Sequence, residues 1–315
     1  MSQKALQKAS DQAKSVVDCD QRKERTALMS FCSCLLLTLL KLFAGLATNS
    51  LALLSEALHS GLDLLACGMT WLAVRFARRP ADQDHTYGHA RSENISALFE
   101  SLLLFGVCYY VVSEGVHRLL EHEARVEPTL WALAIVVISI GVDLNRVRAL
   151  NKVAREAKSQ ALEADAMHFS TDVLSSSVVL AGLLAVYLAG LLDLGPIWHS
   201  WLTKADIAAA FVVAAIIFVV SLKMCRKAIH VLMDGCPPEV VASIRSLVQN
   251  VEGVCSIQSL RMRSAGAVYF IDLTIIVKAS IPVYAGHDIC QRVEESIRQR
   301  YPDSDIQIHV EPGFG

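Results

Sequence analysis

Long apolar runs constrain the fold of this 315-residue chain more than any other feature. A helix needs about 20 predominantly apolar residues to cross the hydrocarbon core of a bilayer. Backbone polar groups inside a bilayer must be satisfied within the segment, so such runs fold as helices. Six runs meet the length requirement, at residues 26–48, 51–77, 92–119, 128–150, 163–190 and 203–224. The sequence therefore predicts an all-α, six-helix transmembrane domain embedded in a lipid bilayer.

Composition agrees with a membrane protein. Hydrophobic residues make up 53% of the chain and charged residues 19%, whereas soluble domains carry about 25% charged residues. The net charge of -2 gives no support for a nucleic-acid partner. The nine cysteines form an odd set, several of them inside apolar runs, and we interpret them as small buried hydrophobes rather than a disulfide framework. The first 25 residues are polar and lack a signal peptide, so the first span itself is expected to target the chain.

Basic residues predict the orientation of the spans. They flank the first span on its N-terminal side, the connection between spans two and three, and the end of span six. They also crowd the cytosolic end of span four and the connection to span five, with Arg146 among them. The opposite connections carry few Lys or Arg. Loops rich in Lys and Arg face the cytosol. Both termini are therefore predicted to be cytosolic. The chain divides into a cytosolic N-terminal segment at 1–25, a six-span transport domain at 26–235 and a cytosolic domain at 236–315.

The sequence of the last domain predicts a small α/β fold. A helix is predicted from Pro237 and Pro238 to about Asn250, followed by strands at 254–263 and 268–277 joined by a turn at 264–266. A helix at 283–300 and a strand at 305–310 complete the order α-β-β-α-β, which fits a sheet with helices on one face. Such a short domain has a thin core, which would gain from pairing with a second copy.

Ionisable side chains recur at the same spacing in two of the predicted spans. The second span carries His59 and Asp63, and the fifth carries His168 and Asp172, each as His-x-x-x-Asp. Residues four apart lie on one face of a helix, one turn apart. Ionisable groups inside spans are costly and indicate function. Two facing helices would thus offer two imidazoles and two carboxylates, a four-ligand set suited to a tetrahedral ion such as zinc.

Each motif is preceded, three residues earlier, by a further acid on roughly the same helix face. These acids are Glu56 and Asp165, and they are predicted to orient the metal ligands as outer-shell partners. The alternative is that the histidines and acids only hold helices together through hydrogen bonds. The repetition of the whole pattern favours metal binding.

These motifs, the loop at 79–89 and the tail resemble the cation diffusion facilitator family from about residue 25 to residue 312. The resemblance implies a homodimeric, proton-coupled exporter of zinc or similar divalent metals, with six spans and a metallochaperone-like cytosolic domain. It also places the transport site at His59, Asp63, His168 and Asp172. Zinc-preferring members tend to have His in the first position of these pairs, so zinc is the expected substrate. No organic cofactor is expected.

Further metal sites follow from the same resemblance. Family members bind a second metal at positions matching Asp82, His85 and His89 in the loop after span two; the alternative is a solvated polar loop. An ion pair near the dimer interface is expected between Arg91 and Asp234. In the cytosolic domain, Gln258 and Glu311 stand where the family's binuclear zinc site has a histidine and an aspartate. We therefore expect a reduced site, or none, from four residues: Asp272, His287, His309 and Glu311.

The expected mechanism is secondary active transport, not enzyme catalysis. Histidine has an ordinary pKa of about 6.5, so it can exchange a proton for a metal near neutral pH. This predicts efflux of zinc in exchange for protons across a prokaryotic plasma membrane. Alternatives are a Mn-, Fe-, Co- or Cd-preferring transporter of the same family, or a metal sensor that signals through its tail. An intramembrane metalloenzyme lacks sequence support, because neither a His-Glu-x-x-His helix nor an evident general base is present.

Overall fold

The computed structural model describes residues 3–48, 51–121, 130–191 and 196–313, which belong to two compact units, Met1–Arg226 and Lys227–Gly315. Within these ranges some side chains lie outside the described part, including those of residues 51–59 and therefore of Glu56 and His59. The first unit is helical, and the second contains a three-stranded sheet.

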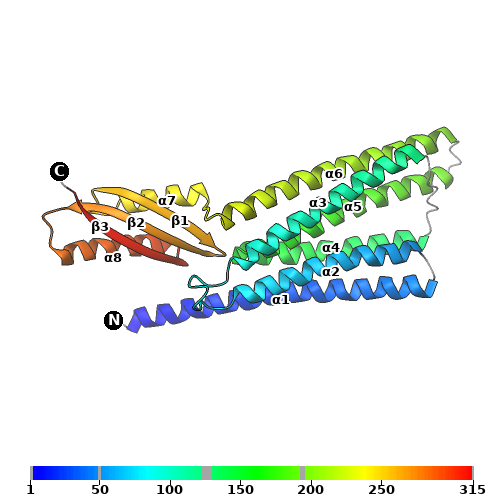
Figure 1. Cartoon of the computed structure of the whole chain (residues 1–315). Helices are drawn as coiled ribbons and strands as arrows, with labels where there is room; N and C mark the ends of the chain where they lie inside the picture. The colour runs from blue at the N-terminus through cyan, green and yellow to red at the C-terminus, as the bar shows by residue number, and fades with distance from the viewer. Residues whose placement is uncertain (1–2, 49–50, 122–129, 192–195, 314–315) are drawn as a thin grey trace. The chain divides into compact units, whose positions relative to one another are not determined.

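Six long helices carry the predicted spans (Figure 1). They are α1 (Gln3–Thr48), α2 (Leu51–Ala77), α3 (Ser92–Glu121), α4 (Leu130–Ala157), α5 (Gln160–Leu191) and α6 (Pro196–Leu232). Helix α1 packs against α2 and α4, and α5 packs against α2, α3 and α4. Among the described residues, three stretches are long and apolar enough to cross a membrane: Asp18–Phe43, Ser92–His117 and Ala208–Leu232. The total of six spans stays a prediction.

Helix α1 begins well before the first predicted span. Its polar part is tied to the rest of the first unit, because the ammonium group of Lys23 lies 2.8 Å from Asp20 Oδ1 and 3.3 Å from Glu93 Oε1 on α3. Lys23 is only 9% exposed. The described part of the segment before residue 26 thus continues the first helix, and Lys23 links it to Glu93 of α3.

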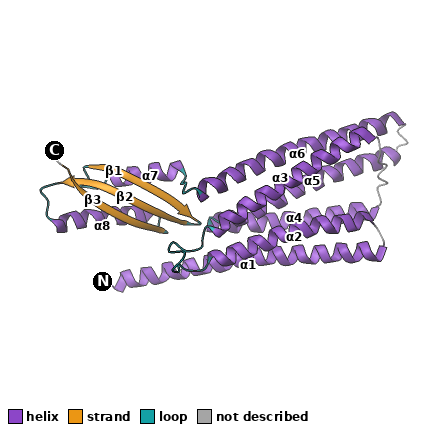
Figure 2. Ribbon diagram, in the orientation of Figure 1, coloured by secondary structure: helices purple, strands orange, loops and turns teal. Residues whose placement is uncertain are grey.

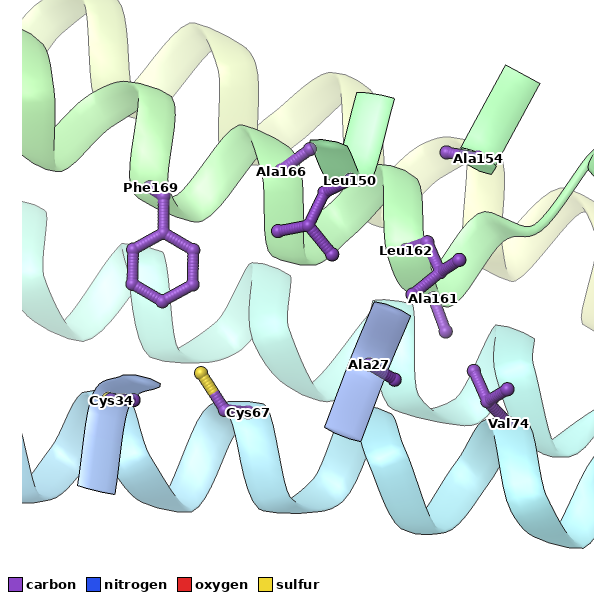
Figure 3. Close-up of a cluster of buried hydrophobic side chains, with 10 residues drawn as sticks. All are labelled: Ala27, Cys34, Cys67, Val74, Leu150, Ala154, Ala161, Leu162, Ala166 and Phe169. Carbon is purple, nitrogen blue, oxygen red and sulfur yellow. The ribbon is translucent and has the colours of Figure 1, made fainter. Parts of the chain in front are cut away.

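A buried cluster joins α1, α2, α4 and α5 (Figure 3). Most of its members are small, which allows close helix approach, and three large side chains fill the remaining space: Leu150, Leu162 and Phe169. The cluster also contains Cys34 and Cys67, in agreement with their expected burial. This packing holds α2 against α5, the two helices that carry the His-x-x-x-Asp motifs.

The second unit has the predicted order α-β-β-α-β, which is confirmed. Its elements are α7 (Pro238–Gln249), β1 (Ser256–Ala265), β2 (Val268–Lys278), α8 (Val283–Arg300) and β3 (Ser304–Gly313). The sheet order is β1-β2-β3, with β1 antiparallel and β3 parallel to β2. The turn is formed by the two residues 266–267 rather than by the predicted 264–266, because Ala265 pairs with Val268 and Gly266 takes a positive φ of 59°.

Both helices of the second unit cover one face of the sheet (Figure 2). Alternate residues of β2, from Ile271 to Val277, point into the core with Ile289, Val293 and Ile297 of α8. Helix α8 also supplies the crossover that a parallel β2–β3 pair requires. The opposite face carries exposed polar residues, including Asp272 and His309.

Candidate functional site

Three residues of the predicted tetrad converge between α2 and α5. The imidazole Nε2 of His168 lies 3.2 Å from Oδ1 of Asp63 and 3.6 Å from Oδ2 of Asp172. One ligand atom from each residue lies within 4.8 Å of the other two. His168 is 3% exposed, while both aspartates are half-buried. One nitrogen and two carboxylate oxygens thus face a common point, as a divalent cation requires.

The fourth predicted ligand is His59, whose side chain lies outside the described residues. Its backbone belongs to α2, one helical turn before Asp63, and this spacing puts both residues on one helix face. Glu56 also lies outside the described side chains. Metal binding by His59 and an outer-shell role for Glu56 therefore stay predictions.

A cavity of about 100 Å³ adjoins the converging carboxylates. Asp63 and Asp172 line it together with Lys41, Ser60, Asp143 and Arg146. The cavity therefore holds fixed positive and negative charges close to the candidate metal ligands. A cation entering it meets three carboxylates, two of which belong to the tetrad.

Arg146 was interpreted from the sequence as one of the basic residues that crowd the cytosolic end of span four. The structure corrects this placement, because the side chain is 7% exposed and lines the cavity. Its guanidinium lies 3.3 Å from Asp143 Oδ1, donates to Ser33 Oγ at 3.0 Å and stacks 4.1 Å from the Phe169 ring centroid. The Asp-x-x-Arg spacing inside an apolar span was the signal for this pair.

Asp165, the acid before His168, is fully buried. Its carboxylate accepts from Ser30 Oγ at 3.1 Å and from Cys67 Sγ at 3.8 Å. The hydrogen bonds described for this carboxylate thus lead to α1 and α2 rather than to His168. Its predicted outer-shell role toward His168 is left as a prediction.

Glu100 on α3 is a fully buried acid that the sequence interpretation passed over. Thr70 of α2 donates a hydrogen bond to its Oε1, and Oε2 has no hydrogen-bond partner. An acid in the interior of span three, far from Glu93 and Glu114 near its ends, was the signal that would have identified it.

The loop residues Asp82, His85 and His89 also converge, as a second group of three metal-ligating side chains. The two carboxylate oxygens of Asp82 lie 3.4 Å from His85 Nδ1 and 3.4 Å from His89 Nε2. His89 is 7% exposed and packs edge-on against Phe76, with ring centroids 4.8 Å apart. This buried histidine fixes one side of the group, while Asp82 and His85 are exposed.

A local turn orients the Asp82 carboxylate. Its Oδ1 accepts from the backbone N–H of His85 at 2.6 Å and from that of Asp84 at 3.1 Å. The His85 N–H is the main cause that lowers the pKa of Asp82 below its usual value, with His89 and His85 as further causes. The carboxylate is therefore ionised at neutral pH, which is the form that binds a cation.

The four residues named for the cytosolic site are not brought together as a group. No three of Asp272, His287, His309 and Glu311, all of which the structure describes, offer ligand atoms within 4.8 Å of one another. His309 Nε2 lies 3.2 Å from Glu311 Oε1 on β3, whereas His287 Nε2 lies 3.2 Å from the Gln291 amide on α8. The sheet separates His287 from His309, since α8 packs on one face of the sheet and His309 is exposed on the other.

Arg91 and Asp234 belong to different units. Arg91 directly precedes α3, and Asp234 follows α6 with a positive φ of 63°. Their pairing near a dimer interface stays a prediction.

Two family models together match nearly the whole chain. The cation efflux transmembrane domain matches residues 27–233, and the cytoplasmic domain of cation efflux proteins matches residues 236–313. Similar full-length proteins include the cation-efflux pump FieF of Citrobacter koseri, 29% identical over 289 residues that cover 91% of this chain and 92% of the pump. The FieF pump of Escherichia coli K12 is 28% identical over the same lengths.

Solved structures match the cytosolic part. The Zn form of CzrB is 33% identical over 25% of this chain and 91% of its own, with a TM-score of 0.24. A MamM-CTD structure is 24% identical over 24% of this chain and 96% of its own, with a TM-score of 0.23. On the match of both family models, the chain belongs to the cation diffusion facilitator family, whose members are multi-pass membrane transporters that export divalent cations.

Proposed function

We propose that this protein exports zinc from the cytosol in exchange for protons, with His59, Asp63, His168 and Asp172 as the transport site. The observation that carries the proposal is the convergence of His168 Nε2 with Asp63 Oδ1, at 3.2 Å, and with Asp172 Oδ2, at 3.6 Å, beside a cavity. Imidazole nitrogen together with carboxylate oxygen suits zinc. Conversion of these contacts into metal bonds requires only that the three groups turn toward a shared ion.

The exchange follows from the chemistry of the ligands. Zinc binds neutral imidazole and ionised carboxylate, so arrival of the ion expels protons from the site, and protonation expels the ion. His168 Nε2, which contacts both carboxylates, is the atom that would hold either the proton or the ion. His168 and His59 are therefore the proposed groups that couple the two flows.

The proposed orientation of the chain in the membrane follows from the positions of the basic loops. Six spans place both termini in the cytosol of a prokaryotic cell, with the N-terminal segment at 1–25, the transport domain at 26–235 and the cytosolic domain at 236–315. The family-model boundaries at 233 and 236 support this division. We include a homodimer in the proposal, with Arg91 and Asp234 as an ion pair near its interface.

The loop group is proposed as an accessory metal site. Asp82, His85 and His89 offer one carboxylate and two imidazoles within 4.8 Å of one another. For the cytosolic domain we propose dimerisation as the main role, because its four candidate ligands do not gather as a group of three. A metal shared between two copies would be needed to use His309 and Glu311.

Transport assays on proteoliposomes test the proposal. Uptake of Zn²⁺, Mn²⁺ and Fe²⁺ is measured under an imposed proton gradient for wild type, Asp63→Ala and His168→Ala. The proposal requires zinc uptake that dissipates the gradient and that both substitutions abolish. Faster Mn²⁺ or Fe²⁺ uptake would exclude zinc as the preferred substrate, and zinc uptake that neither responds to nor moves protons would exclude antiport. Intact dimers that move no metal would favour the sensor.

A further inference from the structure

A buried polar network joins α1, α3 and α5 near the basic loops. Its centre is Glu93, a carboxylate in the first turn of α3 that is only 2% exposed. The ammonium group of Lys23 on α1 lies 3.3 Å from Glu93 Oε1, and the hydroxyl of Ser159, directly before α5, donates to Glu93 Oε2. Both partners are buried as well. One carboxylate thus ties α1 and the start of α5 to α3.

Ser159 belongs both to this network and to the first turn of α5. Its oxygen accepts a hydrogen bond from the backbone N–H of Leu162 at 3.3 Å, so Ser159 is the N-cap residue of α5. Beside it, Asn94 Nδ2 donates to Gln160 Oε1 at 2.6 Å. Two side-chain contacts therefore hold the first turns of α3 and α5 together.

Helix α5 is packed differently on the two sides of His168. From 161 to 169, the stretch that adjoins the basic loop, all but two residues are buried. From 172 to 176 all residues are half-buried, and three of them line the cavity: Asp172, Ser175 and Ser176. The candidate transport site is therefore packed shut toward the end that we assign to the cytosol, while the cavity along α5 extends toward the opposite end.

We propose that Lys23, Glu93 and Ser159 form a latch that closes the cytosolic end of the transport path and opens when the site takes up its ion. This rests on the proposed export function, because only an ion that arrives from the cytosol needs this end to open. Buried ionic groups add little net stability over apolar packing, but they can specify one of two arrangements. A site that faces one side of the membrane at a time requires such a two-state element.

Ser159→Asp separates the latch from the helix cap. The new side chain still accepts from the Leu162 N–H, because Asp is as good an N-cap residue as Ser. Its carboxylate cannot donate to Glu93, and it places a second negative charge beside the first. Adding Glu93→Gln reverses the roles of the two positions, because the amide donates to the new carboxylate and Lys23 keeps one acidic partner. The double variant should therefore rebuild the latch.

Two native cysteines report which end of the bundle opens (Figure 3). Cys67 lies about one turn beyond Asp63 on α2, toward the basic loop, and is 1% exposed. Cys34 is 4% exposed and lines the cavity. Metal-free, full-length protein in detergent is treated with N-ethylmaleimide for different times, and the labelled peptides are quantified by mass spectrometry. Opening of the cytosolic end should expose Cys67 alone, whereas general loosening should expose both thiols.

We expect Ser159→Asp to raise the labelling rate of Cys67 by roughly 3- to 30-fold, the range that changes in such connecting residues give. The rate at Cys34 should stay at the wild-type value. Ser159→Thr, which keeps the hydroxyl, and the double variant should both label as wild type does. The latch is overturned by an unchanged Cys67 rate in Ser159→Asp, by equal increases at both cysteines, or by a double variant that labels as fast as Ser159→Asp.

A second variant decides if Ser159→Asp does not elute as a single species. Glu93→Gln keeps an acceptor for Ser159 but removes the charge that faces Lys23, so it must raise the labelling rate of Cys67 and not that of Cys34. Labelling requires no metal flux, which separates the two proposals. A protein that exports zinc without the labelling effect overturns the latch alone, whereas absent zinc export with the effect intact overturns the transport proposal alone.

Discussion

His168 Nε2 lies 3.2 Å from Asp63 Oδ1, and this contact joins α5 to α2 across the candidate transport site. The ring is 3% exposed, so the contact forms away from bulk water. A second carboxylate, that of Asp172, lies 3.6 Å from the same nitrogen. In the absence of metal, a proton on His168 would balance part of the charge of the two carboxylates. Metal and proton therefore compete for one set of atoms.

Removal of one member of this group should stop transport. Asp63→Asn keeps the size of the side chain but removes the charge that a divalent cation needs, and we expect zinc flux into proteoliposomes to fall to the level of empty vesicles. Ser175→Ala is the matched control, because Ser175 lines the same cavity without belonging to the group. Wild-type flux in Asp63→Asn would remove Asp63 from the transport site.

Removing one member of the buried pair of Arg146 and Asp143 should cost more stability than removing both. Arg146→Met removes the guanidinium that lies 3.3 Å from Asp143 Oδ1, so we expect a loss of about 3–5 kcal/mol. Replacing both residues, as Arg146→Met with Asp143→Leu, should restore most of that loss, because no uncompensated charge remains. Thermal unfolding in detergent, followed by size-exclusion chromatography of the protein that stays folded, measures both. Equal destabilisation by the single and double variants would contradict the pairing.

The sequence carried the motif residues but not their full surroundings. The spacing of His168 and Asp172 within one helix is local, so it could be predicted from the i, i+4 rule. The contact of His168 with Asp63 depends on how α2 packs against α5, and only the repeated motif and the family resemblance suggested it. Arg146 was misplaced for the same reason, because the positive-inside rule counts basic residues without saying which side chain turns into the bundle.

The cytosolic domain was more predictable than the bundle. Its turns and alternating residues, such as Ile271, Leu273 and Ile275, mark the strands directly. The parallel pairing of β2 with β3 was not predictable from these local signals. Local signals likewise could not predict that the cytosolic ligands are apart, since His287 lies on the helix layer and His309 on the exposed face of the sheet.

Two substitutions at Asp82 should separate charge from turn geometry. Asn at this position can still accept hydrogen bonds from the backbone N–H groups of Asp84 and His85, but it has no charge for a cation. In a protein whose tetrad carries Asp63→Ala and His168→Ala, we expect Asp82→Asn and Asp82→Ala to lose zinc binding alike in calorimetry. Only Asp82→Ala should increase hydrogen exchange at residues 84–85. Retained zinc binding in Asp82→Asn would exclude the loop site.

The pH dependence of this turn has a defined sign. The pKa of Asp82 is lowered in the folded protein, chiefly by the His85 N–H. A lowered pKa contributes stability that is present above the unfolded value of about 3.9 and is lost as pH falls through the folded value. We therefore expect protection of the His85 amide, relative to Asp82→Ala at each pH, to persist from neutral pH to about pH 4 and to decline only below it. A decline between about pH 7 and pH 5 would assign the turn to histidine protonation instead.

Two glycines of the cytosolic domain should respond to alanine in opposite directions. Gly253 has a φ of 97°, and a Cβ there would lie 2.7 Å from Cδ1 of Ile289. Alanine at this position must adopt a conformation that L-residues avoid and must also displace a core side chain, so we expect a loss of more than about 1 kcal/mol. Gly286 lies in α8, and a Cβ there meets nothing within 4 Å. Because alanine is the better helix former by about 0.5–1 kcal/mol, Gly286→Ala should stabilise the same domain.

Hydrogen exchange of β1 and β2 in the full-length protein measures the effect of both substitutions, with faster exchange expected in Gly253→Ala and slower exchange in Gly286→Ala. Faster exchange in Gly286→Ala would show that the open space beside α8 is filled in the assembled protein, for example by a second copy of the chain.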